Sequence, residues 1–130
     1  MTPDEEPVRW HRRVLRTPIG LLIVGLVLIW VVEIVDTVAL GARLQRHGIH
    51  PRQADGLDGI VWAPFLHSDF GHVASNSVPL LALGGLVAIR GMRYWARVTA
   101  LTVVVGGGLT WLMAGGSNHI GASGGVFGYL

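Results

Sequence analysis

The most constraining feature of this 130-residue chain is a set of long apolar runs, separated by short segments that hold most of its charges. Residues 19–32 carry no charged side chain, and the apolar pattern continues past Glu33 and Asp36 to Leu40. A helix of about 20 apolar residues is long enough to cross the hydrocarbon core of a bilayer. The pattern therefore predicts an all-α membrane protein, a polytopic helical bundle.

The apolar runs predict three full spans and the start of a fourth. We place the three spans at residues 19–40, 72–89 and 98–114, and the fourth helix begins near His119 or Ile120. Residues 1–17 form a polar N-terminal segment, and residues 18–130 form one membrane domain. An arginine-rich start before an apolar run also fits a signal peptide, but this run is long and no clear small-x-small cleavage site follows it. We therefore favour an uncleaved span.

The arginines predict how the chain is oriented. Four lie within residues 9–16 and three within residues 90–97, whereas the turn after the third span has no charge. Basic residues favour the cytoplasmic side, which predicts a multi-pass protein of a bacterial cell membrane with a cytoplasmic N-terminus. Three more arginines in the loop 41–66 weaken this contrast.

Composition narrows the range of partners. The chain has no cysteine and a formal net charge of only +2, and all ten of its basic residues are arginines. Disulfides and thiolate metal sites are therefore excluded, and no basic patch of a nucleic-acid-binding module is present. The apolar runs predict the lipid bilayer as a partner. No sequence feature indicates a cofactor.

A serine between glycines stands at the start of the fourth helix, in the sequence Gly121-Ala122-Ser123-Gly124. A serine hydroxyl becomes a nucleophile when a base takes its proton, and small neighbours let a substrate backbone approach it. Gly124 and Gly128 are four residues apart, the spacing with which small residues bring membrane helices together. Taken alone, this stretch also fits ordinary helix packing.

A second polar group lies at the start of the second span. His72 and Asn76 are four residues apart, so they share one helix face, and both side chains can donate hydrogen bonds. Two donors so arranged suit the stabilisation of an oxyanion. They also suit a hydrogen-bonded contact with a neighbouring helix. Zinc binding by His67, Asp69, His72 and His119 is a further alternative, but the spacing lacks the helical zinc pattern, and we expect no metal.

Together the two motifs resemble the rhomboid family of intramembrane serine proteases. In that family H-x-x-x-x-H-x-x-x-N opens the second core helix and G-x-S-G opens the fourth. The resemblance covers about residues 20–130. Trp62 is followed by Ala63, which departs from a Trp-Arg pair that many members carry in this loop. The residues that match the two motifs are His67, His72, Asn76, Gly121, Ser123 and Gly124.

The resemblance implies a role for each matching residue. Ser123 would be the nucleophile, His72 and Asn76 would stabilise the oxyanion, and His67 would hold the loop. Phe127 falls where the family carries an aromatic that packs against the catalytic histidine, and Gly121, Gly124 and Gly128 would give structural support. The implied function is cleavage of transmembrane segments of other membrane proteins. A non-catalytic rhomboid-like protein that binds membrane clients is the alternative.

The family's general base is a histidine on the sixth core helix. Only seven residues follow Ser123. We therefore expect this chain to be part of a longer protein and to lack the catalytic histidine.

Overall fold

A computed structural model describes residues 16–116 and 118–130, apart from the side chain of Val126. The predicted cytoplasmic segment, residues 1–17, lies almost entirely outside the described residues. The described part is mostly helical, as predicted, and contains no β-strand beyond one antiparallel bridge between Ile49 and His119. Its elements are α2 (Pro18–Val35), η1 (Asp36–Leu40), η2 (Leu44–His47), η3 (Ala54–Gly56), α3 (Gly59–Trp62), η4 (Ala63–Phe65), α4 (Phe70–Ala88), α5 (Met92–Leu101), η5 (Thr102–Gly106), α6 (Gly107–Met113) and α7 (Ser123–Gly128).

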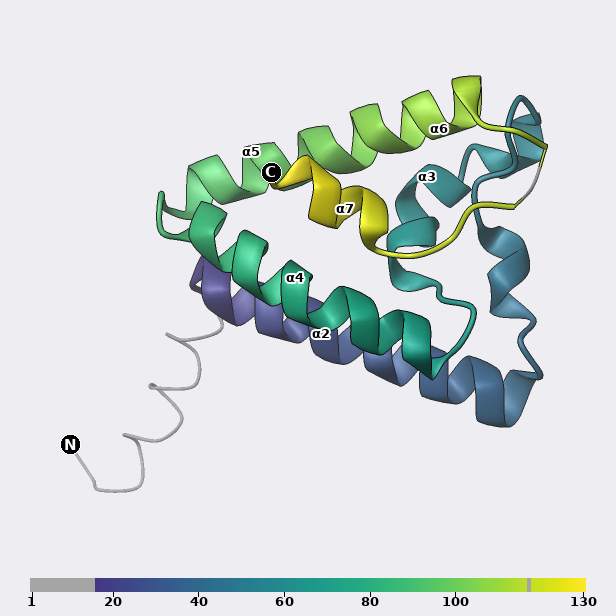
Figure 1. The fold of residues 1–130 in the computed structure, drawn as a ribbon, viewed down its shortest axis with the longest axis horizontal. Coiled ribbons are helices and arrows are strands. Elements are labelled where there is room, and N and C mark those ends of the chain that lie inside the picture. The colour runs from purple at the N-terminus through teal and green to yellow at the C-terminus, as the bar shows by residue number, and fades with distance from the viewer. Residues whose placement is uncertain (1–15, 117) are drawn as a thin grey trace.

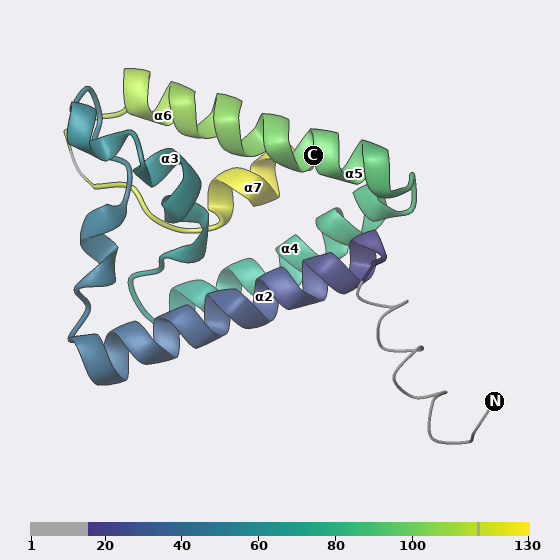
Figure 2. The same cartoon turned by 180° about the vertical axis from the view of Figure 1, so that it is seen from behind.

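Three continuous helical segments are long and apolar enough to cross a membrane, at Pro18–Leu40, Phe70–Ala88 and Met92–Met113. The segments α2 and α4 lie side by side, and α7 lies between them and the third segment (Figure 1). The third segment consists of α5, η5 and α6 and is called the third helix below. The same arrangement is seen from behind in Figure 2. The prediction of a helical membrane bundle is therefore confirmed.

Large apolar side chains cover the outside of this bundle. Val78, Ile89 and Met113 are 71%, 75% and 74% exposed, and many other aliphatic residues are exposed on the same helices. A soluble protein rarely exposes so large an apolar surface, whereas lipid accommodates it without cost. The chain is an integral membrane protein.

The first and second spans pack through a small apolar core. Leu22, Ile29, Val73 and Leu80 are buried there. Gly84 permits the close approach, because a Cβ at this position would lie 2.9 Å from a methyl carbon of Leu22. Lipid is as apolar as these side chains, so close packing rather than exclusion of water holds the two helices together.

The third helix begins six residues earlier than predicted. The predicted spans leave residues 90–97 as a connector, but α5 starts at Met92, directly after Gly91 with φ +95°. A glycine with positive φ turns the chain without strain, so a short turn suffices. Long arginine side chains can lie along a helix end and still reach water. The Arg90 guanidinium lies over the Tyr94 ring, 5.4 Å from its centroid.

The fourth helix begins later than predicted, at Ser123 rather than at His119 or Ile120. The backbone before Ser123 is bonded to the loop instead of to itself. His119 and Ile49 exchange two backbone hydrogen bonds, at 2.9 and 3.0 Å, and Gly121 donates to the Ala63 carbonyl at 2.8 Å. Because these partners hold the segment extended, the helix starts only after it.

The loop between the first two spans is itself fixed to the end of the third helix. The Arg52 amide donates to the Trp111 carbonyl at 2.9 Å, and its guanidinium donates to the carbonyls of Leu112 and Ala114 at 3.2 and 3.0 Å. The Trp111 indole donates to the Gln53 carbonyl at 2.8 Å. The three bonds from Arg52 satisfy carbonyl groups at the helix end that have no partner within the helix.

Candidate active site

The His72 and Asn76 motif occupies the first turns of α4, where an aspartate sets the start of the helix. Asp69 has an extended backbone, and its Oδ1 accepts a hydrogen bond from the His72 amide at 2.8 Å. Such a bond satisfies one of the free amides at a helix N-terminus. The helix then presents His72 and Asn76 on one face, one turn apart.

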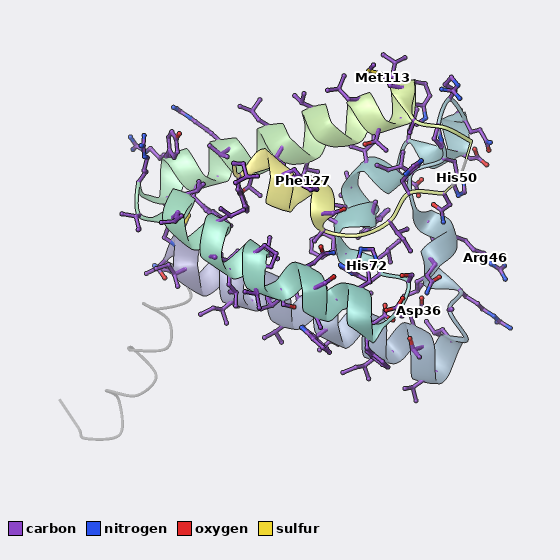
Figure 3. All side chains as sticks on the ribbon, in the orientation of Figure 1. Asp36, Arg46, His50, His72, Met113 and Phe127 are labelled. Atoms are coloured by element: carbon purple, nitrogen blue, oxygen red, sulfur yellow. The ribbon has the colours of Figure 1, made fainter. Side chains whose placement is uncertain are left out.

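Gly121 is the point where α4, the loop and the serine segment meet. Its φ of +113° is one that residues with a side chain rarely adopt. A Cβ at this position would lie 2.7 Å from both Cε1 and Nε2 of His72, and 3.6 Å from Nδ2 of Asn76. The absence of a side chain therefore lets both polar groups of α4 approach the backbone two residues before Ser123. Figure 3 shows His72 on the side of α4 that faces this segment.

The Asn76 amide nitrogen is buried and has no hydrogen-bond partner among the described residues. Most buried donors in folded proteins are paired, because an unpaired one costs about 1–3 kcal/mol. This unpaired donor is the one that faces Gly121. A donor kept in this state is free to bind an acceptor that a ligand brings.

His67 holds the residue before Ser123. Its side chain is 1% exposed, and its Nε2 accepts a hydrogen bond from the Ala122 amide at 3.3 Å. Burial and then the nearby His72 lower the pKa of His67 to about 4, although Asp69 and the Phe65 carbonyl favour the protonated ring. The carbonyl does not reach hydrogen-bond geometry with Nδ1, which is buried without a partner among the described residues. His67 is therefore neutral near pH 7 and acts as an acceptor.

The two histidine rings are close together and have different surroundings. Their centroids are 5.0 Å apart in an edge-on arrangement. The half-buried His72 contacts the Ser68 hydroxyl through Nδ1 at 3.2 Å, and that hydroxyl donates to Asp69 Oδ2 at 2.9 Å. Hydrogen bonds from the His72 amide and then from Ser68 lower the pKa of Asp69 from its ordinary value. Asp69 is therefore an anion joined to His72 through one hydroxyl.

Ser123 is the first residue of α7 and is partly buried. It lines a cavity of about 240 Å³, together with Gly121, Gly124 and Phe127, between the loop and the third helix. Within residues 16–116 and 118–130, no hydrogen bond joins the Ser123 hydroxyl to a histidine ring. The described part of the structure thus brings Ser123 together with His67 and with the two polar side chains of α4, His72 and Asn76.

The other predicted support residues differ in their surroundings. Gly128 faces the third helix, since a Cβ there would clash with the Thr102 side chain. A Cβ on Gly124 would meet nothing within 4 Å, and Phe127 is 72% exposed. Of these three residues, only Gly128 allows a close approach to a neighbouring described helix.

Two residues of this site have no such role among the sequence-based predictions, which include Asp69 only as a zinc ligand and give Ser68 no role. An aspartate directly before a helical apolar pattern is a recognised N-cap signal and would have placed Asp69. The Ser68 contact has no sequence signal, because it depends on the rotamer of His72. Among the described residues, no group of three or more histidine or acidic side chains is arranged to hold a metal ion.

Comparison with known families agrees with the two motifs. A model of the rhomboid domain matches residues 56–130, more than half of the chain. The chain belongs to the rhomboid family. The matched region includes both motifs of this rhomboid chain, from the loop that carries His67 to the helix that begins at Ser123.

The chain is similar to several mycobacterial proteins that are described as uncharacterized. Uncharacterized proteins of Mycobacterium tuberculosis and Mycobacterium bovis are each 40% identical over 109 residues, which is 79% of this chain and 45% of the relative. An uncharacterized protein of Mycobacterium leprae is 36% identical over 133 residues, 96% of this chain and 53% of the relative. The chain thus spans about half the length of the curated relatives it matches. No solved structure gives a significant match.

Proposed function

We propose that this rhomboid protein is an intramembrane serine protease that cleaves transmembrane segments of other membrane proteins. The observation that carries the proposal is the convergence at Gly121. Two side-chain donors of α4, one of them buried with no partner among the described residues, face the backbone two residues before a serine. An oxyanion site needs donors of this kind to be in place before charge develops.

The residues then have separate roles in acyl transfer. Ser123 attacks the carbonyl carbon of the scissile peptide bond, and a base takes the hydroxyl proton. His72 and Asn76, with the Ser123 amide, donate to the oxyanion. His67 keeps the preceding backbone in place through the Ala122 amide. We assign the base to the histidine that the family fold carries on its sixth core helix.

The site would lie toward the outer side of a bacterial membrane. The arginine pattern supports this orientation, and the relatives reported above are bacterial. A reporter that is active only in the cytoplasm, fused after Arg93, should be active. An inactive reporter would overturn the orientation.

Cleavage that depends on Ser123 is the test of the activity. The full-length protein should cleave a model transmembrane substrate and react at Ser123 with a fluorophosphonate or isocoumarin probe. Ser123→Ala should abolish both, whereas Ser75→Ala on the exposed side of α4 should preserve both. If Ser123→Ala leaves cleavage unchanged, or if the folded protein cleaves nothing, the proposed protease function is wrong. The alternative, a non-catalytic protein that binds membrane clients, then replaces it.

A further inference from the structure

A chain of three polar groups lies behind His72, on the side away from Gly121. The Asp69 carboxylate, the Ser68 hydroxyl and His72 Nδ1 follow one another at 2.9 and 3.2 Å. The opposite ring nitrogen, Nε2, is the one that faces Gly121. His72 is thus held at one nitrogen and presents the other to the site.

The direction of these hydrogen bonds follows from which groups carry protons. The Asp69 carboxylate is ionised and can only accept, so the single Ser68 hydroxyl proton is committed to it. The Ser68 oxygen must then accept from His72, which requires a proton on Nδ1. A neutral imidazole with its proton on Nδ1 has a lone pair on Nε2 and cannot donate there.

We propose that Asp69 and Ser68 are positioning residues that keep a proton on His72 Nδ1, so that His72 donates to the oxyanion as a doubly protonated, cationic ring. This inference rests on the proposed protease function and adds two residues to it. The second proton comes from solvent, and the ring keeps both protons while it donates from Nε2. Asp69 stabilises the positive charge through Ser68.

Of the ionisable groups on the loop and on the neighbouring first span that are named below, Asp69 is the one that can balance a positive charge on the His72 ring. His67 lies beside His72, but it is buried, neutral and bonded to the Ala122 amide. The carboxylates of Glu33 and Asp36 on the neighbouring first span are buried and accept from the Thr37 hydroxyl and the Leu44 amide. Among these groups, only Asp69 is hydrogen-bonded to a partner of the His72 ring.

The position of the ring proton can be measured without any substrate. In full-length protein labelled with ¹⁵N-histidine, with His72 assigned by His72→Phe, Nδ1 should carry a proton in the wild type. Asp69→Asn keeps the helix cap, since asparagine caps as well as aspartate. Its amide would donate to Ser68, which would then donate to Nδ1, so the proton should move to Nε2. A wild-type ring protonated on Nε2 alone, or no change in Asp69→Asn, overturns the proposal.

Kinetics test whether this arrangement serves catalysis. Ser68→Ala should lower kcat by about 3- to 30-fold at little change in KM, less than the loss of a whole oxyanion donor. In the His72→Ala background it should have no further effect, because Ser68 acts through that ring. Ser75→Ala, which removes a hydroxyl bonded to the His72 carbonyl and not to the ring, is the matched control.

The outcomes separate this inference from the proposed function. If the fold-losses of kcat in Ser68→Ala and His72→Ala multiply in the double variant, Ser68 does not act through His72 and the inference is overturned. If Ser123→Ala abolishes cleavage while Ser68→Ala and Asp69→Asn change neither kcat nor the ring proton, the proposed protease function holds and the positioning role of Asp69 and Ser68 is wrong. If Ser123→Ala leaves cleavage unchanged, the proposed protease function is wrong, and Asp69 and Ser68 have no catalytic reaction to support.

Discussion

The serine end of the bundle, which comprises the loop before α4 and the segment before Ser123, is built differently from the third helix. At the serine end the loop and this segment exchange backbone hydrogen bonds, and His67 and Ala122 are buried there. In the third helix, none of the residues Met92–Met113 is buried. Directional bonds thus fix the atoms around the serine, whereas the third helix presents mainly apolar side chains to its surroundings.

The same substitution should therefore have opposite effects in the two regions. Gly121→Ala forces a side chain into a positive φ, about 1–2 kcal/mol, and into the His72 ring, about 1–3 kcal/mol for overpacking. We expect the free energy of unfolding to fall by about 2–5 kcal/mol. Gly108→Ala in the third helix meets nothing within 4 Å and should raise it by about 0.5–1 kcal/mol.

Unfolding of both variants in detergent, followed by circular dichroism against denaturant, measures this difference. Equal effects in the two regions would show that the serine end is no more tightly constrained than the third helix.

Acid should destabilise the serine end through His67. Its ordinary pKa is 6.5, and its pKa in the fold is about 4, so between these values the unfolded chain binds more protons. The stability that the fold has while His67 is neutral is fully present above pH 6.5. It is lost as the pH falls toward 4, by up to about 3 kcal/mol. His67→Gln cannot titrate, and its unfolding free energy should depend less on pH over this range.

The control is His47→Gln, which makes the same change at an exposed histidine of the loop, 4.0 Å from the Asp58 carboxylate. If His67→Gln and the wild type change alike between pH 6.5 and 4, burial of His67 is not what makes the fold acid-sensitive.

The smallest expected effect concerns the contact between the two regions. Arg52→Ala removes the hydrogen bonds to the Leu112 and Ala114 carbonyls and should cost about 1 kcal/mol. Hydrogen exchange should increase at the C-terminal end of α6. Arg93→Ala, an exposed arginine at the other end of the third helix, should change neither. Unchanged exchange near Leu112 in Arg52→Ala would mean that the loop does not hold this helix end.

The sequence predicted the helical bundle because charge-free apolar runs have few alternatives. It placed His72 and Asn76 on one face because their spacing alone decides that. It could not place the start of the fourth helix, because the backbone of Gly121 bonds to Ala63, more than fifty residues away. It placed the start of the third helix too late, because arginines that are typical of a connector can also lie along a helix end. It did not identify Ser68, because the rotamer of His72 rather than a sequence spacing brings the two side chains together.

The central claim is that the polar groups at the serine end serve catalysis rather than helix packing, and Asn76 tests it most directly. Because its Nδ2 has no partner among the described residues, removing it breaks no hydrogen bond of that atom. In the full-length protein, Asn76→Ala should lower kcat by about 10- to 1000-fold, the effect of losing an oxyanion donor. The midpoint of thermal unfolding, measured on the same preparation, should change little. A loss of activity that instead follows the loss of folded protein would contradict the claim and make Asn76 a packing residue.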